Sequence, residues 1–116
     1  MILIFGGAYQ GKLTWAVQHY RLHADELCDL AHGFLPGKRC YYHLESLTRA
    51  ADGPVSPDLF PADAIVIARE VGSGVVPVDA AERAWRERHG TLLRQLAGQA
   101  HTVMRIFCGL PQTLKS

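Results

Sequence analysis

Residues 2–12 read Ile-Leu-Ile-Phe-Gly-Gly-Ala-Tyr-Gln-Gly-Lys, an apolar run that ends in glycines and a lysine. The run 2–5 does not alternate apolar with polar residues, which is typical of a strand buried on both faces of a parallel sheet. Apolar residues at helical spacing then follow over residues 13–24. The opening of the chain therefore predicts a strand, a glycine-rich turn and a helix.

The turn matches the pattern G-x-x-x-x-G-K, which is typical of a loop that cradles phosphate. Glycines let successive backbone N–H groups converge on an anion, and the start of the helix adds partial positive charge. The alternative is an ordinary strand-to-helix turn with a solvated lysine. We expect the catalytic residue Lys12 to reach the β- and γ-phosphates. The residues expected to bind nucleotide are Gly6, Gly7, Ala8, Tyr9, Gln10, Gly11, Lys12, Leu13 and Thr14.

One position departs from the pattern. The residue after the lysine is usually Ser or Thr, whose hydroxyl ligates Mg²⁺, but here it is Leu13. Thr14 comes one step later, and one helical step turns a side chain by about 100°. The motif therefore supports phosphate binding more strongly than Mg²⁺-assisted catalysis.

The rest of the chain continues the alternation of strands and helices. Buried strands are expected at 64–68 and 102–108, and a helix from Asp79 to about 99, with Asp79 as its N-cap and Glu82 completing a capping box. Trp85 has the spacing of a core residue. Such alternation predicts an α/β protein of the P-loop NTPase type, three layers with a small, mostly parallel sheet. We expect residues 1–116 to form a single nucleotide-binding domain.

The middle of the chain has weaker signals. Residues 38–51 have an apolar stripe that favours a second helix, and residues 25–37 allow one helical turn before glycines and a proline interrupt it. Three prolines within residues 52–61 indicate an irregular loop. We expect only a short C-terminal tail after Gly109.

Composition narrows the class of protein. The 116 residues are 48% hydrophobic and 20% charged, with a formal net charge of +1. Near-neutral charge argues against a nucleic-acid partner, and the apolar runs are too short to span a membrane. The three cysteines lack zinc-type spacing and favour reduced thiols, so we expect a cytoplasmic protein. His19 and His23 have the spacing of two zinc ligands, but an open helix face explains them, and we expect no metal held by protein side chains alone. A narrow sheet makes a homo-oligomer possible.

A second glycine-bearing loop, Glu-Val-Gly-Ser-Gly-Val-Val-Pro at 70–77, follows the strand at 64–68. Ligands of open parallel sheets bind at the carboxyl ends of the strands, so Glu70 is expected near the nucleotide if the two strands are neighbours. The alternative is a helix-entry turn with a solvated glutamate. The residues we assign to this second loop are Glu70, Val71, Gly72, Gly74 and Pro77.

The two loops together, with Cys-Gly-Leu-Pro at 108–111 and Leu-Lys at 114–115, resemble the adenosylcobinamide kinase/adenosylcobinamide-phosphate guanylyltransferase family of cobalamin biosynthesis. The resemblance covers about the first twenty residues and most of 64–115, as in a shortened, divergent member. It implies a P-loop fold that binds GTP or ATP with Mg²⁺ and phosphorylates adenosylcobinamide. It also implies transfer of GMP through a guanylylated histidine. Lys12 and Glu70 carry over as catalytic residues.

Residues 25–62 do not carry over, because they are too short and too different from the family segment that holds the nucleophilic histidine. His43 and His32 are the available candidates, and each is also explained as a solvated or packing residue. The sequence leaves two hypotheses open. The chain is either a small P-loop kinase of the cobinamide type, or a catalytically degenerate module that binds nucleotide or a partner without turnover.

Overall fold

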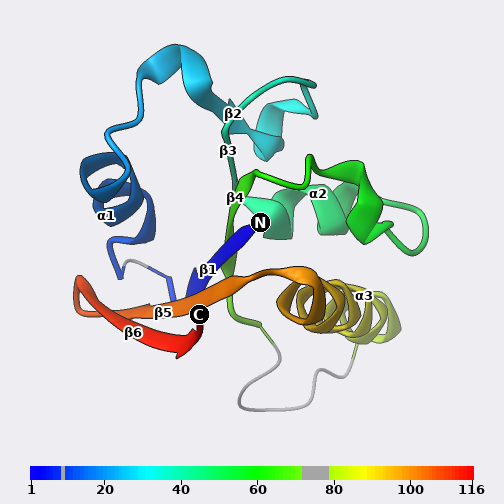
Figure 1. Ribbon diagram of the computed structural model, residues 1–116. Helices are drawn as coiled ribbons and strands as arrows, with labels where there is room; N and C mark the ends of the chain where they lie inside the picture. Colours follow the sequence, from blue (N-terminus) through cyan, green and yellow to red (C-terminus); the bar gives the residue numbers. More distant parts are fainter. Residues whose placement is uncertain (9, 72–78) are drawn as a thin grey trace.

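The computed structural model describes residues 1–8, 10–71 and 79–116, and its framework is one six-stranded sheet in the order β2-β3-β4-β1-β5-β6. Strand β1 (Ile2–Gly6) lies between β4 (Ile65–Arg69) and β5 (Thr102–Phe107), and both pairs are parallel. Strands β2 (Leu27–Asp29) and β3 (Cys40–Tyr42) extend the parallel sheet beyond β4. The edge strand β6 (Leu110–Lys115) is antiparallel to β5 (Figure 1).

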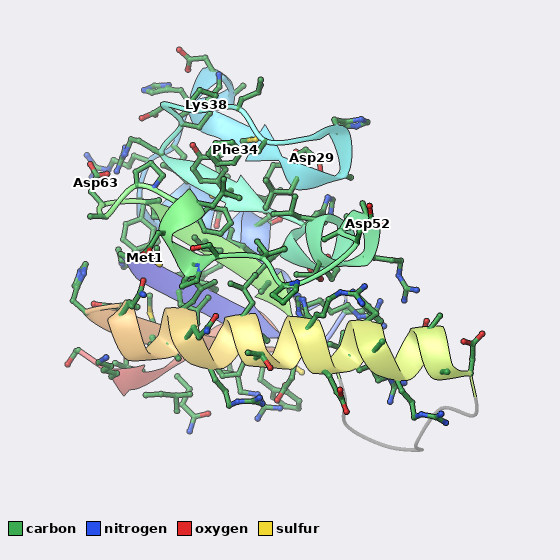
Figure 2. All side chains as sticks on the ribbon, turned by 90° about the vertical axis from the view of Figure 1, so that its right-hand side faces the viewer. Met1, Asp29, Phe34, Lys38, Asp52 and Asp63 are labelled. Atoms are coloured by element: carbon green, nitrogen blue, oxygen red, sulfur yellow. The ribbon has the colours of Figure 1, made fainter. Side chains whose placement is uncertain are left out.

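The helices lie on both faces of this sheet. Helix α1 (Lys12–His19) packs on one face, against a cluster that includes Ile4. Helices α2 (Leu44–Ala50) and α3 (Ala80–Gln99) cover the other face, against a cluster that includes Leu3. Figure 2 shows α3 lying lengthwise across the sheet. The prediction of a three-layer α/β fold of the P-loop type with a mostly parallel sheet is confirmed.

The apolar run of β1 contributes core side chains on both faces of the sheet. Leu3 and Ile4 are 1% and 0% exposed and point to opposite faces, as successive side chains of a strand do. Burying such side chains contributes about 1.5–3 kcal/mol each, so this short strand anchors both helical layers. The prediction of a strand buried on both faces is confirmed.

The helix expected at 38–51 is wrong in its first third. Residues 40–42 form β3, and α2 begins only after His43, which adopts a left-handed conformation with φ 63°. Tyr41 explains the difference, since it is fully buried and its ring stacks on Phe34 at 5.1 Å and meets Phe60 edge-on at 5.4 Å. Tertiary burial of an aromatic side chain outweighed the local helical spacing.

Four further boundaries differ from the sequence expectation. Helix α1 ends at His19 rather than near residue 24, so the pair at 19 and 23 does not share a helix. Residues 24–32 hold two 3₁₀ turns, Ala24–Glu26 and Leu30–His32, on either side of β2. The expected irregular loop contains one 3₁₀ turn, Pro57–Leu59, with its proline at the first position. The expected tail is β6.

Helix α3 matches its prediction closely. The Asp79 carboxylate accepts hydrogen bonds from the N–H groups of Ala81 and Glu82, at 2.7 and 3.3 Å, and so caps the helix. Trp85 is buried, as its spacing indicates. The predicted capping box is wrong, because the Glu82 carboxylate pairs instead with the guanidinium of Arg49 on α2 through two bonds, at 2.9 and 3.0 Å. Among the described residues, no helix is both long and apolar enough to cross a membrane.

Gly6 provides a test of how tightly β1 and β5 are joined. A Cβ on Gly6 would stand 2.6 Å from the carbonyl oxygen of Ile106, closer than real contacts allow. We expect Gly6→Ala to lower the free energy of unfolding by about 1–3 kcal/mol, the usual cost of overpacking. Urea denaturation measures this change in the free energy of unfolding. Gly53→Ala is the matched control, because within the described part of the chain no atom beyond its two chain neighbours lies within 4 Å of the added Cβ. Equal stability of the two variants would contradict the prediction.

Candidate functional site

We call residues 6–12 the phosphate loop, after the predicted motif. It joins the end of β1 to the start of α1. Gly11 is the N-cap of the helix in a left-handed conformation, with φ 81°, which glycine adopts without steric cost. The backbone therefore turns sharply just before Lys12, and the helix N-terminus faces the edge of the sheet where the parallel strands end. Tyr9, one of the expected nucleotide-binding residues, lies outside the described residues.

Lys12 lies across this loop. Its Nζ donates a 2.7 Å hydrogen bond to the carbonyl of Gly7. Partial burial lowers the pKa of the ammonium below its ordinary value, the Glu45 carboxylate acts in the opposite direction, and Arg69 lowers it further. An anion placed at the loop would add a counter-charge that favours the protonated form.

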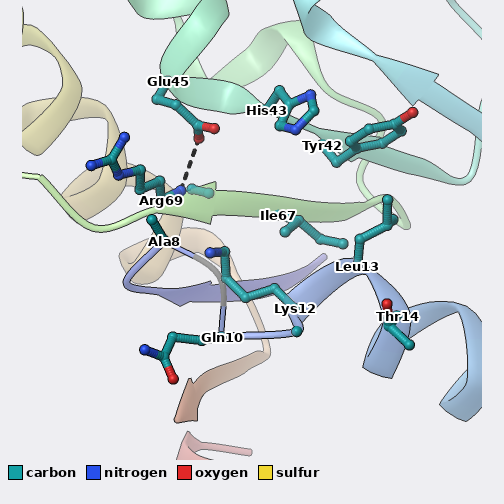
Figure 3. Close-up of a pocket in the computed structure, with 12 residues that line it drawn as sticks. Ala8, Gln10, Lys12, Leu13, Thr14, Tyr42, His43, Glu45, Ile67 and Arg69 are labelled. Carbon is teal, nitrogen blue, oxygen red and sulfur yellow. Dashed lines mark hydrogen bonds between the residues drawn. The ribbon is translucent and has the colours of Figure 1, made fainter. Parts of the chain in front are cut away.

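A cavity of about 340 Å³ opens beside the loop (Figure 3). Its walls come from three parts of the chain that are distant in sequence. The lining residues are Ala8, residues 10–14, Tyr42, His43, Glu45 and residues 67–69. The predicted loop residues Ala8, Gln10, Gly11, Lys12, Leu13 and Thr14 are thus brought together at one cavity. Its volume fits a small-molecule site of ordinary size.

Glu45, in the first turn of α2, is a functional residue that sequence reasoning missed. One carboxylate oxygen accepts a 2.9 Å hydrogen bond from the backbone N–H of Arg69, shown dashed in Figure 3. This bond fixes α2 to the end of β4 and holds an acidic group opposite Lys12. The only available signal was the pair of aromatic residues before His43, which favours a strand that ends there.

His43 also lines the cavity, and a carboxylate orients its ring. Nδ1 of His43 lies 2.7 Å from Oδ1 of Asp29, the last residue of β2. Desolvation acts to raise the pKa of Asp29, but the hydrogen bonds from His43 and from the N–H of Ala31 lower it overall. An ionised Asp29 accepts a hydrogen bond from Nδ1–H, and in the neutral imidazole this tautomer places the lone pair on Nε2.

His32, the other candidate histidine, is placed differently. Its Nε2 lies 3.7 Å from the second oxygen of Asp29, and its side chain is 85% exposed. It does not line the cavity beside the phosphate loop. The structure therefore brings His43, and not His32, to the residues that were predicted to bind nucleotide.

Leu13 and Thr14 both line the cavity, although the motif usually has a hydroxyl at the first of these two positions. Leu13 lines the cavity where a hydroxyl is usual, and it also packs on the core beneath α1. Thr14 is exposed on the next helical step. Among the described residues, no group of three or more His, Cys, Asp or Glu side chains could hold a metal ion.

The second loop begins beside the first. The N–H of Glu70 donates a 2.8 Å hydrogen bond to the carbonyl of Gly6, so the two loops leave the sheet from neighbouring strands, as expected. The Glu70 carboxylate, however, faces Arg105 on β5, at 3.5 Å, and does not line the phosphate-loop cavity. Val71 follows it in the described chain. Gly72, Gly74 and Pro77 lie outside the described residues.

A buried polar network supports this edge of the sheet from below. Nε2 of His89 lies 2.7 Å from the carbonyl oxygen of Arg69, and Nδ1 lies 2.9 Å from the hydroxyl of Thr48. The indole of Trp85 donates to the same hydroxyl at 3.0 Å. Because a carbonyl only accepts, the proton of His89 resides on Nε2 and Thr48 donates to Nδ1. The network fixes α2, α3 and the end of β4 relative to one another.

Comparison with known proteins adds one finding to this geometry. The family model described as cobinamide kinase / cobinamide phosphate guanyltransferase matches residues 53–114, more than half of the chain. The matched segment includes β4, the second loop, α3 and the β5–β6 hairpin. It does not include the phosphate loop. No curated protein matches the chain.

The buried histidine gives a prediction for pH. Burial lowers the pKa of His89, although the bond to the Arg69 carbonyl and the charge of Glu45 oppose the effect. As the pH falls, His89 is therefore protonated at a higher pH in the unfolded chain than in the folded protein. Above about pH 6.5, His89 is neutral in both the folded and the unfolded chain and costs no stability. Below about pH 6.5, the free energy of unfolding decreases as the pH falls, by no more than about 1.4 kcal/mol per pH unit.

Urea denaturation between pH 7.5 and 5 measures this dependence. The wild type should lose more stability on acidification than His89→Gln, which has no ring to protonate. His19→Gln, at an exposed position on α1, is the control and should follow the wild type. Identical slopes for the wild type and His89→Gln would contradict the prediction.

Proposed function

Because the chain belongs to the cobinamide kinase / cobinamide phosphate guanyltransferase family, we propose that it binds GTP or ATP at the phosphate loop and transfers the γ-phosphoryl group to adenosylcobinamide. The observation that carries the proposal is the juxtaposition of Lys12, Glu45 and His43 around one cavity at the helix N-terminus. Residues 1–116 act as a single nucleotide-binding domain in this proposal. The free cysteines support action in the cytoplasm.

Phosphate binding follows from the loop chemistry. Backbone N–H groups and the helix N-terminus stabilise the negative charge, and Lys12 exchanges its bond to the Gly7 carbonyl for the β- and γ-phosphate oxygens. A Mg²⁺ ion would neutralise charge on the phosphates when bound. The residues fit such an ion through Glu45, since Mg²⁺ is commonly held by one or two carboxylates, phosphate oxygens and water. Leu13 contributes no ligand.

The transfer step needs a base at the acceptor hydroxyl. That oxygen forms a bond to the γ-phosphorus, while the bond from γ-phosphorus to the bridging oxygen breaks and the nucleoside diphosphate leaves with its electron pair. Nε2 of His43 accepts the hydroxyl proton, and Asp29 stabilises the imidazolium that forms. Glu70 remains a proposed catalytic residue at the entrance to the second loop.

The same nitrogen supports the family's second reaction. In guanylyl transfer, Nε2 of His43 would attack the α-phosphorus of GTP and pyrophosphate would leave. His43 is preferred to His32 for this role because it lines the cavity. His43 lacks the neighbours expected from the family, so phosphorylation is the primary proposal and guanylyl transfer the secondary one.

A second candidate function is a module that binds nucleotide or a partner without turnover. Leu13 favours it, because the position directly after the lysine has no hydroxyl to ligate Mg²⁺. The two candidates share nucleotide binding and differ only in the transfer step.

Nucleotide binding is tested first. We expect millimolar GTP or ATP with Mg²⁺ to raise the melting temperature, and Lys12→Ala to remove most of the shift. Loss of charge-assisted phosphate contacts costs about 1.5–3 kcal/mol, or about ten- to hundred-fold in affinity. Lys38→Ala is the control, because Lys38 is half-buried, its ammonium donates a hydrogen bond to the carbonyl of Asp25, and it does not line the cavity. An unchanged melting temperature in the wild type would refute the kinase and the nucleotide-binding form of the module.

Turnover is tested with nucleotide labelled on the γ-phosphate and adenosylcobinamide as acceptor. We expect labelled product from the wild type and about 10²- to 10⁴-fold less from His43→Gln, the usual contribution of a general base. His32→Gln is a matched control, because both histidines contact Asp29 but only His43 lines the cavity. Absence of product above the Lys12→Ala background would leave only the binding module.

A further inference from the structure

The turn between β5 and β6 is hydrogen-bonded to the phosphate loop at Gln10. The N–H of Cys108 donates a 2.6 Å hydrogen bond to the side-chain oxygen of Gln10. The next N–H, of Gly109, donates a 3.0 Å bond to the backbone carbonyl of the same Gln10. The Cα of Gly109 also lies 3.8 Å from the place where a Cβ on Gly11 would stand. The hairpin therefore packs directly against the loop.

The shape of the turn makes this double contact possible. Cys108 and Gly109 both have positive φ, 52° and 75°, as in the two-residue turns that match the twist of a hairpin. A left-handed conformation is strained for cysteine and occurs where the surroundings impose it. Here it directs two successive amide donors at Gln10.

We propose that Gln10 is a positioning residue and that the β5–β6 turn, through it, presets the phosphate loop for the polyphosphate of a nucleotide. The inference rests on the proposed function. In a trans peptide, the carbonyl and the following N–H point in opposite directions. With the Gln10 carbonyl held by Gly109 on the β5 side, the N–H of Gly11 points toward the β4 side. The cavity lies on that side, since residues 67–69 line it.

Holding one peptide matters because the loop is rich in glycine. A free glycine loop samples many conformations, and binding an anion would require ordering them. Two hydrogen bonds from a rigid hairpin remove part of that requirement before the ligand arrives. The hairpin belongs to the segment that the family model matches, whereas the loop does not. Gln10 is thus a contact through which the matched segment acts on the phosphate site.

The experiment compares Gln10→Met with the wild type and with Gln112→Met. The Gln10 substitution keeps the length of the side chain and removes the acceptor. The Gln112 substitution is the matched control on the exposed strand β6. Two quantities are measured: amide hydrogen exchange at Cys108 and Gly109 in the free proteins, and affinity for GTP with Mg²⁺ and for inorganic triphosphate by calorimetry.

We expect Gln10→Met to speed exchange of the Cys108 amide and to weaken binding of both probes about three- to ten-fold, with the melting temperature of the free protein unchanged. Gln112→Met should match the wild type. Gln10→Glu retains an acceptor oxygen and should restore slow exchange, which separates hydrogen bonding from side-chain bulk. Should Gln10→Met fold poorly, Gln10→Ala, which removes the same side-chain acceptor, takes its place in the exchange and affinity measurements.

The outcomes separate this inference from the proposed function. Faster exchange in Gln10→Met with unchanged affinity would overturn the positioning role and leave nucleotide binding intact. Unchanged exchange would overturn the contact itself. Failure of the wild type to bind either probe would refute the proposed function and the inference that rests on it.

Discussion

Parallel pairing of β1 with β4 is the constraint on which the site depends. The register sets Ile2 opposite Ile65 and Gly6 opposite Arg69, so both strands end at the same edge. The phosphate loop leaves from one strand and Glu70 follows the other, joined by the bond from the Glu70 N–H to the Gly6 carbonyl. Gly6 lies close to a backbone carbonyl of β5, which leaves no room for a side chain. Three strands thus converge where the predicted nucleotide site begins.

The side chains that form or support the site come from elements on both sides of β1. Helix α2 contributes Glu45, which is bonded to the backbone of Arg69, and the end of β3 leads to His43, which is oriented by Asp29 of β2. The buried His89 and Thr48 hold the same strand end from the α3 side. On the other side of β1, the β5–β6 turn holds Gln10. The loop is therefore supported by packed, hydrogen-bonded structure rather than by its own sequence alone.

The family model and the predicted phosphate loop cover different parts of the chain. The family model matches 53–114, which contains the second loop and the hairpin. The phosphate loop lies before it and was predicted from the spacing of glycines and lysine. Sequence patterns are weak over residues 25–52. This segment contains Asp29, His43 and Glu45. This segment places His43 and Glu45 in the lining of the cavity, with Asp29 bonded to the histidine.

The sequence by itself determined the local elements: the buried strand at 2–6, the phosphate loop, helix α3 with its Asp79 cap, and the two later parallel strands. These follow from apolar runs, helical spacing and turn residues, all of which act over a few neighbouring positions. Only the tertiary structure decided that residues 40–42 form a strand, that Glu45 rather than Glu70 faces Lys12, and that Gln10 is bonded to the hairpin. Each of these depends on contacts between distant segments, such as the burial of Tyr41 against Phe34 and Phe60. A three-residue strand has too little local preference to be recognised until its partner strand is present.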